Sequence, residues 1–176
     1  MEIKRFTEFE ISVQLHRKII NLKNKCFPDF KKNRSYYKQL PHFRLLIFEK
    51  DKLIGHVGID HRVILIEKTP KFIFGIIDLC IERRFRNKNL ASRLLEKITN
   101  LGLKNNIDFL FLFTKDYRLY KKNNFKNISA YCSWLKINEH KNYGIANEII
   151  KDEIMIKGLG NNKWENKKID FLGYLF

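Results

Sequence analysis

Hydrophobic positions follow a helical period in the N-terminal part of the chain. Between residues 8 and 27, apolar side chains recur every three to four positions, at Ile11, Leu15, Ile19, Leu22 and Cys26. This spacing predicts an amphipathic helix, and Pro28 is expected to end it. The segment 34–40, before Pro41, is a second, shorter helix candidate.

The period then changes to that of strands. Residues 43–66 contain two apolar runs separated by the polar segment 49–52, which predicts a β-hairpin. Residues 71–82 are almost continuously apolar, which is typical of a strand in the middle of a sheet. The sequence therefore predicts three consecutive strands.

A second helical pattern covers residues 90–104, with Leu90, Leu94, Ile98 and Leu101 on one face. The apolar segment 107–114 that follows predicts another strand, and a strand–helix–strand crossover of this length implies parallel strands. Later elements are expected in a short helix at 117–124, a strand at 125–137, an edge strand at 153–159 and an apolar end at 170–176. Together they predict an α+β fold with a mixed, mostly antiparallel sheet and flanking helices.

Composition indicates one domain, 1–176. The 176 residues include 3 prolines and 8 glycines, and no segment rich in Pro, Gly or Ser separates two halves. The three cysteines, Cys26, Cys80 and Cys132, show neither a disulfide framework nor the spacing of a metal site. Because the N-terminus lacks the apolar stretch of a signal peptide and no apolar run is long enough to span a bilayer, we expect a cytoplasmic protein without metal or membrane.

The net charge of +16 has two interpretations. A large basic excess favours an anionic partner, but the lysines are scattered along the chain, as on an ordinary solvated surface. A nucleic-acid-binding module is the less favoured reading, since the helix at 90–104 shows no arginine stripe.

The segment between the third strand and the helix at 90–104 carries the most specific signal. Arg84, Arg86 and Lys88 precede a helix N-terminus, where cations are unfavourable unless an anion binds. A strand that enters a helix through a tight loop is a common phosphate site, because the first N–H groups of the helix face the ligand. Such a loop needs residues that tolerate positive φ, and Asn87 and Asn89 do so more readily than most non-glycine residues.

Residues 78–95, "DLCIERRFRNKNLASRLL", resemble motif A of the GCN5-related N-acetyltransferases. The family pattern R/Q-x-x-G-x-G/A corresponds to Arg86–Ala91, with Asn89 at the central glycine and Asn87 at another frequent glycine. The resemblance implies that backbone N–H groups of 86–92 hold the pyrophosphate of acetyl-CoA and that the end of the strand binds the pantetheine arm. The coenzyme-binding residues that it implies are Cys80, Ile81, Arg86, Asn87, Lys88, Asn89, Leu90, Ala91 and Ser92.

A second segment, "LYKKNNFKNI" at 119–128, resembles the Y-x-x-x-G-F element of the same family, with Asn124 at the glycine. Tyr120 then takes the place of the tyrosine that protonates the departing coenzyme A thiolate. Asp78 is the candidate base for the acceptor amine, directly or through water, and its alternative role is a strand acid paired with a lysine. Cys80 is read as a core residue rather than as an acyl-carrying nucleophile.

The family resemblance covers residues 43–138 and leaves 139–176 as a C-terminal extension. The layout of this extension is similar to that of aminoglycoside 2'-N-acetyltransferases and nodulation N-acyltransferases, which would imply an amino-sugar acceptor and an acidic cleft, with Asp60, Asp78, Glu82 and Asp116 as the nearest acids. We therefore expect an acetyl-CoA-dependent N-acetyltransferase that acts on a primary amine of a small molecule or protein. The alternatives are an N-acyltransferase with a longer acyl donor and an inactive acyl-CoA sensor; the apolar C-terminus also favours a homodimer.

Overall fold

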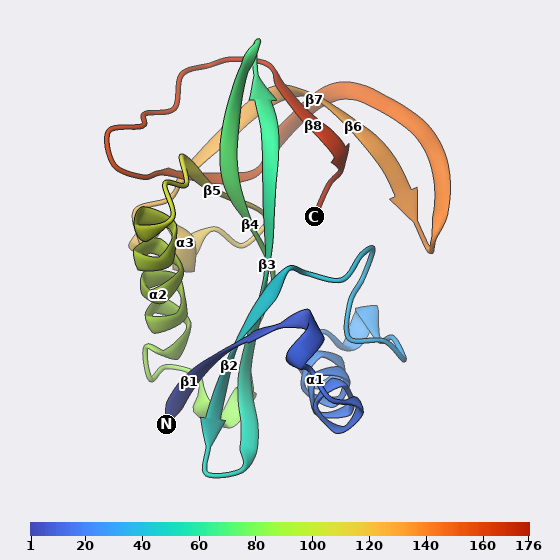
Figure 1. Ribbon diagram of the computed structural model, residues 1–176, viewed down its shortest axis with the longest axis vertical. Helices are drawn as coiled ribbons and strands as arrows, with labels where there is room; N and C mark the ends of the chain where they lie inside the picture. The colour runs from blue at the N-terminus through green and yellow to red at the C-terminus, as the bar shows by residue number, and fades with distance from the viewer. The chain divides into compact units, whose positions relative to one another are not determined.

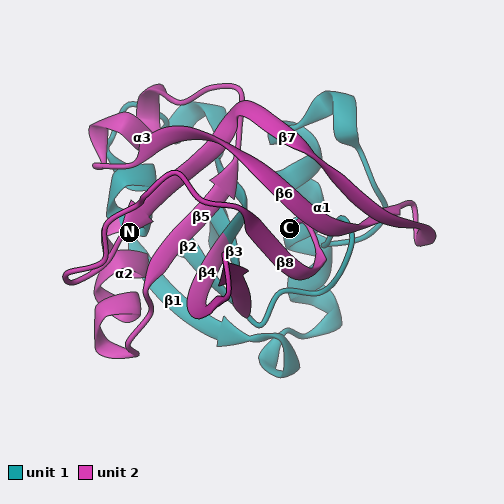
Figure 2. Ribbon diagram, turned by 90° about the horizontal axis from the view of Figure 1, so that it is seen from above, with its two compact units in different colours: residues 1–60, 76–95 teal, residues 61–75, 96–176 magenta.

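A computed structural model describes residues 1–176. The chain divides into two compact units, one of residues 1–60 and 76–95 and the other of residues 61–75 and 96–176 (Figure 2). We call them unit 1 and unit 2. Two long strands and one helix pass from one unit to the other, and each unit is described by itself below.

Unit 1 contains the N-terminal elements and the first hairpin. Its complete elements are β1 (Glu2–Thr7), the 3-10 turn η1 (Glu8–Glu10), α1 (Val13–Cys26), η2 (Pro28–Phe30), β2 (Phe43–Glu49) and η3 (Arg83–Phe85). It also includes residues 52–60 of β3 (Lys52–Ile66), residues 76–81 of β4 (Thr69–Ile81) and residues 90–95 of α2 (Leu90–Lys104). The strands of this unit follow the order β1-β2-β3-β4.

Helix α1 covers one face of the unit 1 strands (Figure 1). Its N-terminus is capped by Ser12, whose side chain accepts a hydrogen bond from the Leu15 N–H at 3.2 Å. The apolar face predicted from the sequence places Ile19 and Leu22 in a buried cluster with Leu46 of β2 and Cys80 of β4. This packing brings the C-terminal turn of α1 next to the end of β4.

Unit 2 is dominated by strands. Its complete elements are β5 (Phe109–Phe113), the short helix α3 (Arg118–Lys122), β6 (Lys126–Asn138), β7 (Lys141–Gly158) and β8 (Ile169–Tyr174). β4 pairs in parallel with β5 over Ile73–Gly75, and the order continues as β5-β7-β6-β8. β6 and β7 form a long, curved hairpin (Figure 1). The core beneath these strands is rich in isoleucine and phenylalanine, including Ile73, Phe111 and Phe171.

Most predicted elements are confirmed. The hairpin of β2 and β3, the helix at 90–104, the short helix before β6 and the parallel β4–β5 crossover all occur where the pattern predicts them. The α+β fold class is confirmed as well.

Four details of the prediction were wrong. Residues 34–40 form bends instead of a helix, and the Arg34 guanidinium donates to the Tyr37 carbonyl at 3.0 Å there. The first helix begins at Val13, after η1, and the sequence pattern missed β1 because only Ile3 and Phe6 of this strand are shielded from solvent. Residues 153–159 lie mostly in β7, between β5 and β6, and so are not an edge strand.

None of the helices combines the length and hydropathy that a bilayer-spanning helix needs.

Candidate active site

The loop between β4 and α2 has the backbone conformation that the sequence predicts. Asn87 has φ of 62° and Asn89 has φ of 55°, both in the left-handed region. Asn124, the third asparagine at a family glycine, has φ of 65°. Each asparagine therefore adopts the geometry for which glycine is usually required.

Helix α2 begins immediately after this loop. The side chain of Leu90 is buried, whereas Asn87, Lys88 and Asn89 are exposed. The Arg93 N–H donates to the Asn89 carbonyl at 3.0 Å, which closes the first turn. The first N–H groups of an α-helix have no acceptor within the helix, so the first turn of α2 has the backbone geometry that anion sites at helix N-termini use.

The cations of the loop differ in their contacts. Arg86 folds back on the strand, and its Nε donates to the Ile81 carbonyl at 3.1 Å. The Lys88 ammonium lies 5.4 Å from the centre of the Phe85 ring. Arg86 thus links the loop to the end of β4, a contact that the sequence did not predict.

Asp78 occupies an irregular position in β4. Its φ is 51°, so the strand is locally distorted at this residue. Its carboxylate forms an ion pair with the Lys23 ammonium of α1, which also donates to the Ser35 carbonyl at 3.2 Å. The alternative reading of Asp78 as a strand acid paired with a lysine therefore describes its contact, and its role as a base stays a prediction.

A buried polar network supports the carbonyl of Asp78. This carbonyl lies 2.9 Å from Nδ1 of His56, and Nε2 of His56 lies 2.9 Å from Nη1 of Arg44. Arg44 in turn donates to both carboxylate oxygens of Glu8 at 2.8 Å and to the Ser35 carbonyl at 2.9 Å. Burial, assisted by the positive charge of Arg44, holds the pKa of His56 well below its usual range, so the ring is neutral.

Two thiols meet beside the loop. Cys80, buried in β4, packs in the same cluster as Cys26 of α1, whose Sγ donates to the Ile81 carbonyl at 3.5 Å. The hydrogen bond between the thiols lowers the pKa of Cys26 to about 7, with a smaller contribution from Arg86, and raises the pKa of Cys80, which is also buried, well above its ordinary value. Cys80 is thus a protonated core residue, as the sequence indicated, and a poor nucleophile.

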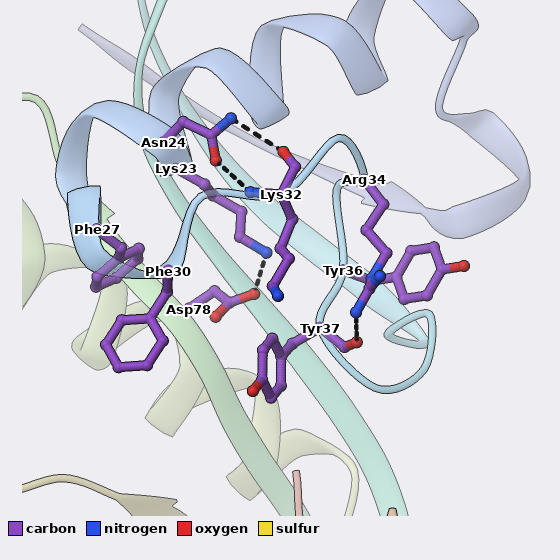
Figure 3. A pocket seen from close by; sticks show the side chains of 9 residues that line it. All are labelled: Lys23, Asn24, Phe27, Phe30, Lys32, Arg34, Tyr36, Tyr37 and Asp78. Atoms are coloured by element: carbon purple, nitrogen blue, oxygen red, sulfur yellow. Dashed lines mark hydrogen bonds and ion pairs between the residues drawn. The ribbon is translucent and has the colours of Figure 1, made fainter. Parts of the chain in front are cut away.

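A cavity of about 250 Å³ opens within unit 1 next to Asp78 (Figure 3). Its walls come from the end of α1, from η2 and the segment that follows, and from β4, namely Lys23, Asn24, Phe27, Phe30, Lys32, Arg34, Tyr36, Tyr37 and Asp78. The segment is anchored to α1, because the Asn24 side chain exchanges two hydrogen bonds of 3.0 Å with the backbone of Lys32. The candidate base therefore faces a cavity with a fixed wall.

The other candidate acids lie in different settings. Glu82 pairs with Lys52 at 2.7 Å, Asp116 pairs with Arg118 at 3.0 Å, and Asp60 is buried. Of these four acids, Asp78 alone lines the cavity, which also contains three cations. The cavity is therefore basic, in contrast to the acidic cleft that an amino-sugar acceptor would imply.

Tyr120 lies in α3 of unit 2. Its ring packs edge-on against Phe125, with centroids 5.8 Å apart. Burial, with a smaller effect of the Asp116 charge, raises the pKa of Tyr120 to about 12. The phenol is consequently protonated throughout the physiological pH range and can act as a hydrogen-bond donor.

Comparison with known proteins identifies the family of this chain. Residues 16–125 match the acetyltransferase (GNAT) family. The chain belongs to this family. The match includes the asparagine loop, the Lys23–Asp78 pair and Tyr120, so the resemblance seen in the sequence is confirmed.

Individual GNAT relatives are distant. A protein of Amsacta moorei entomopoxvirus, provisionally named glycylpeptide N-tetradecanoyltransferase, is 26% identical over 133 residues, which cover 70% of this chain and 43% of the relative. The chain thus spans less than half the length of this curated relative. The Escherichia coli GNAT family N-acetyltransferase YhbS in complex with CoA has a similar structure, with a TM-score of 0.63 and 11% sequence identity. The aligned region covers 97% of this chain and 88% of the YhbS chain.

A GNAT acetyltransferase of Brucella melitensis in complex with acetyl-CoA has a TM-score of 0.59 and 12% identity, with 96% of this chain and 94% of its own covered. At these identities the similarity shows the GNAT fold. Together with the family match, it supports a CoA-type co-substrate and an acyltransferase.

Sequence reasoning missed Lys23 and Cys26. Lys23 and Cys26 are three positions apart on α1, and Asp78 and Cys80 are two positions apart on β4, so each pair occupies one face of its element. The two spacings indicate that each pair shares a face, but the sequence alone does not show that α1 packs against β4. The partners of His56 come from β2 and β4, so the local sequence does not determine them.

Proposed function

We propose that residues 1–176 act as one acyltransferase domain that transfers an acetyl group from acetyl-CoA to a primary amine. The observation that carries the proposal is the loop before α2, where Asn87 and Asn89 adopt positive φ within a segment that matches the GNAT family. Three free cysteines are consistent with a reducing, cytoplasmic setting. A homodimer stays a prediction.

The donor half of the reaction belongs to the loop. Backbone N–H groups of 86–92 bind the pyrophosphate, with Arg86 and Lys88 adding positive charge. Cys80 and Ile81 offer their backbone to the pantetheine arm, and Ala91 is small enough for close approach. The ligand is held by the fixed backbone rather than by flexible side chains, which lowers the entropic cost of binding.

Asp78 is the proposed base for the acceptor amine, and Tyr120 is the proposed hydrogen-bond donor to the leaving group. The amine attacks the thioester carbonyl, a C–N bond forms, the C–S bond breaks, and coenzyme A leaves as a thiolate. Asp78 takes one proton of the ammonium, directly or through water, and the second proton, which the nitrogen loses as the C–S bond breaks, passes to the thiolate or to solvent. Since an ordinary thiol has a pKa of about 8.5 and Tyr120 has one of about 12, Tyr120 stabilises the thiolate chiefly by hydrogen bonding.

A longer acyl donor is the second candidate. It is favoured by the name of the entomopoxvirus relative, which refers to a tetradecanoyl group. An inactive acyl-CoA sensor would share the loop and its binding properties but not the chemistry.

One experiment separates these functions. The purified chain is incubated with an amine panel and with acetyl-, octanoyl- or tetradecanoyl-CoA, and released coenzyme A is measured by chromatography, which avoids interference from the protein thiols. Release with acetyl-CoA supports the proposal, and release only with the longer donors supports the second candidate. Tight binding of acyl-CoA without release of coenzyme A for any amine would identify a sensor. If the chain neither binds acyl-CoA nor releases coenzyme A, the acetyltransferase, the longer-chain acyltransferase and the sensor are all contradicted.

A further inference from the structure

The cavity beside Asp78 has a distinct chemical character. Its lining contains three cations, Lys23, Lys32 and Arg34, and a single carboxylate, Asp78, which is paired with Lys23. The lining is therefore net positive, and two of its cations, Lys32 and Arg34, lie on the segment that follows η2 (Figure 3). The cavity should therefore bind an anionic group of a ligand more favourably than a cationic one.

Aromatic rings form the rest of the walls. Phe27, Phe30, Tyr36 and Tyr37 line the cavity, and Phe30 and Tyr37 remain 66% and 36% exposed. Exposed rings that border a cavity are a typical apolar surface for a ligand. The Lys32 ammonium lies 5.8 Å from the centre of the Tyr37 ring, and the Arg34 guanidinium lies 5.7 Å from that of Tyr36, so each cation lies close to an aromatic surface.

The wall is held in place before a ligand binds. Asn24 fixes the backbone of Lys32, and the Arg34 side chain donates to the Tyr37 carbonyl at 3.0 Å. The carbonyl of Ser35 accepts from both Lys23 and Arg44. A prearranged wall of this kind discriminates between ligands, because it does not adjust to fit the wrong one.

We infer that the acceptor is an amine that also carries an anionic group and an aromatic or similarly flat apolar group. This inference rests on the proposed function, since it assigns the cavity to the acceptor. The ammonium of the acceptor meets the Asp78 carboxylate, which has two oxygens and about four acceptor sites. The anion meets Lys32 and Arg34, and the flat group lies against the tyrosine and phenylalanine rings. Polycationic amino sugars fit this lining poorly.

The test uses matched amines with the full chain and an acyl-CoA donor from the set above. Phenylalanine is compared with phenylalaninamide and 2-phenylethylamine, which lack the anion, and with alanine, which lacks the ring. The phosphonate analogue of phenylalanine distinguishes a carboxylate site from a phosphate-type site, and kanamycin represents a polycation. We expect phenylalanine or its phosphonate to exceed the amide by about tenfold in kcat/KM, as for a charged hydrogen bond.

Two variants locate the effect. Lys32→Gln removes the charge but keeps the backbone contacts with Asn24, and we expect it to abolish the preference for the anionic amines. Lys31→Gln changes the exposed neighbouring lysine, which does not line the cavity, and should keep the preference. Equal or better use of the amide, the phenylethylamine or kanamycin by the unmodified chain would overturn the inference and leave the proposed function intact.

Failure of the proposed function has a different signature. If no amine releases coenzyme A, calorimetric binding of the same panel decides about the cavity. Selective binding of the anionic aromatic amines that Lys32→Gln removes would support the inference about the ligand. Binding without this selectivity, or no binding, would contradict it.

Discussion

Nε2 of His56 lies 2.9 Å from Nη1 of Arg44 in the interior of unit 1. An arginine guanidinium can only donate, so Nε2 accepts this hydrogen bond and the ring proton is on Nδ1. Nδ1 then donates to the Asp78 carbonyl, 2.9 Å away. His56 therefore holds β4 at the distorted position of Asp78, and its hydrogen bond with Arg44 requires the neutral ring, because only a neutral Nε2 can accept.

This arrangement makes the stability of the protein depend on pH. The pKa of His56 is well below 6.5 in the folded chain, so below about pH 6.5 the unfolded chain binds a proton that the folded chain does not. The free energy of unfolding should fall by about 1.4 kcal/mol per pH unit as the pH decreases below that point. Urea unfolding between pH 7.5 and 5 should show this slope, and His56→Gln should reduce it. An unchanged slope in His56→Gln would contradict the assignment of the pH dependence to the buried, neutral His56.

Asp78→Asn tests the acceptor half of the mechanism. The substitution keeps the shape of the side chain but removes its basicity, so kcat should fall by about a hundredfold, the lower range of general base catalysis. Affinity for acetyl-CoA should be unchanged in calorimetry. Asp29→Asn, at an exposed position in η2, is the matched control. Wild-type turnover in Asp78→Asn would leave Asp78 with only its ion pair to Lys23.

Tyr120→Phe tests the leaving-group half. Loss of the phenol hydroxyl should slow turnover by about tenfold or more while acetyl-CoA binds almost as before. Because the pKa of Tyr120 is about 12, the activity of the unmodified chain should show no decline from tyrosine ionisation up to about pH 10. Tyr117→Phe, at the exposed start of the same helix, should behave like the unmodified chain. Equal loss of turnover and binding would mean that Tyr120 has a structural role.

Arg86→Glu tests the charge at the loop. The variant reverses a cation next to the proposed pyrophosphate and removes the hydrogen bond to the Ile81 carbonyl. We expect the affinity for acetyl-CoA to fall by more than about tenfold. Arg84→Glu makes the same change in net charge at an exposed residue of the loop and should have a smaller effect. If the two variants lower the affinity for acetyl-CoA equally in calorimetry, the effect comes from the net charge of the protein and not from the position of Arg86.

The sequence predicted the parts of the fold that depend on local patterns. The helix at 90–104 and the strands on either side of it follow from the hydrophobic period, and the positive φ of Asn87 and Asn89 follows from the residue type. Residues 34–40 were mistaken for a helix because their order comes from contacts with α1 and β2, through Ser35, instead of from a local period.

The candidate site was predictable in part for the same reason. Asp78 and the loop belong to one continuous segment, so the sequence places them together. Lys23 is 55 positions from Asp78 along the chain, and its partner is determined only when α1 packs on β4. The cavity could not be predicted, because eight of its nine lining residues belong to the continuous stretch 23–37, and the place of this stretch beside Asp78 depends on how α1 packs on β4.

Asn89 provides the most direct test of the central claim, that the asparagine loop holds the pyrophosphate of acetyl-CoA. Glycine tolerates the φ of 55° at this position, whereas a β-branched residue there costs about 1–2 kcal/mol. Calorimetric titration with acetyl-CoA should show nearly unchanged affinity for Asn89→Gly and a loss of about tenfold for Asn89→Val. Equal affinity of the two variants, or no binding of acetyl-CoA to the unmodified chain, would contradict the claim.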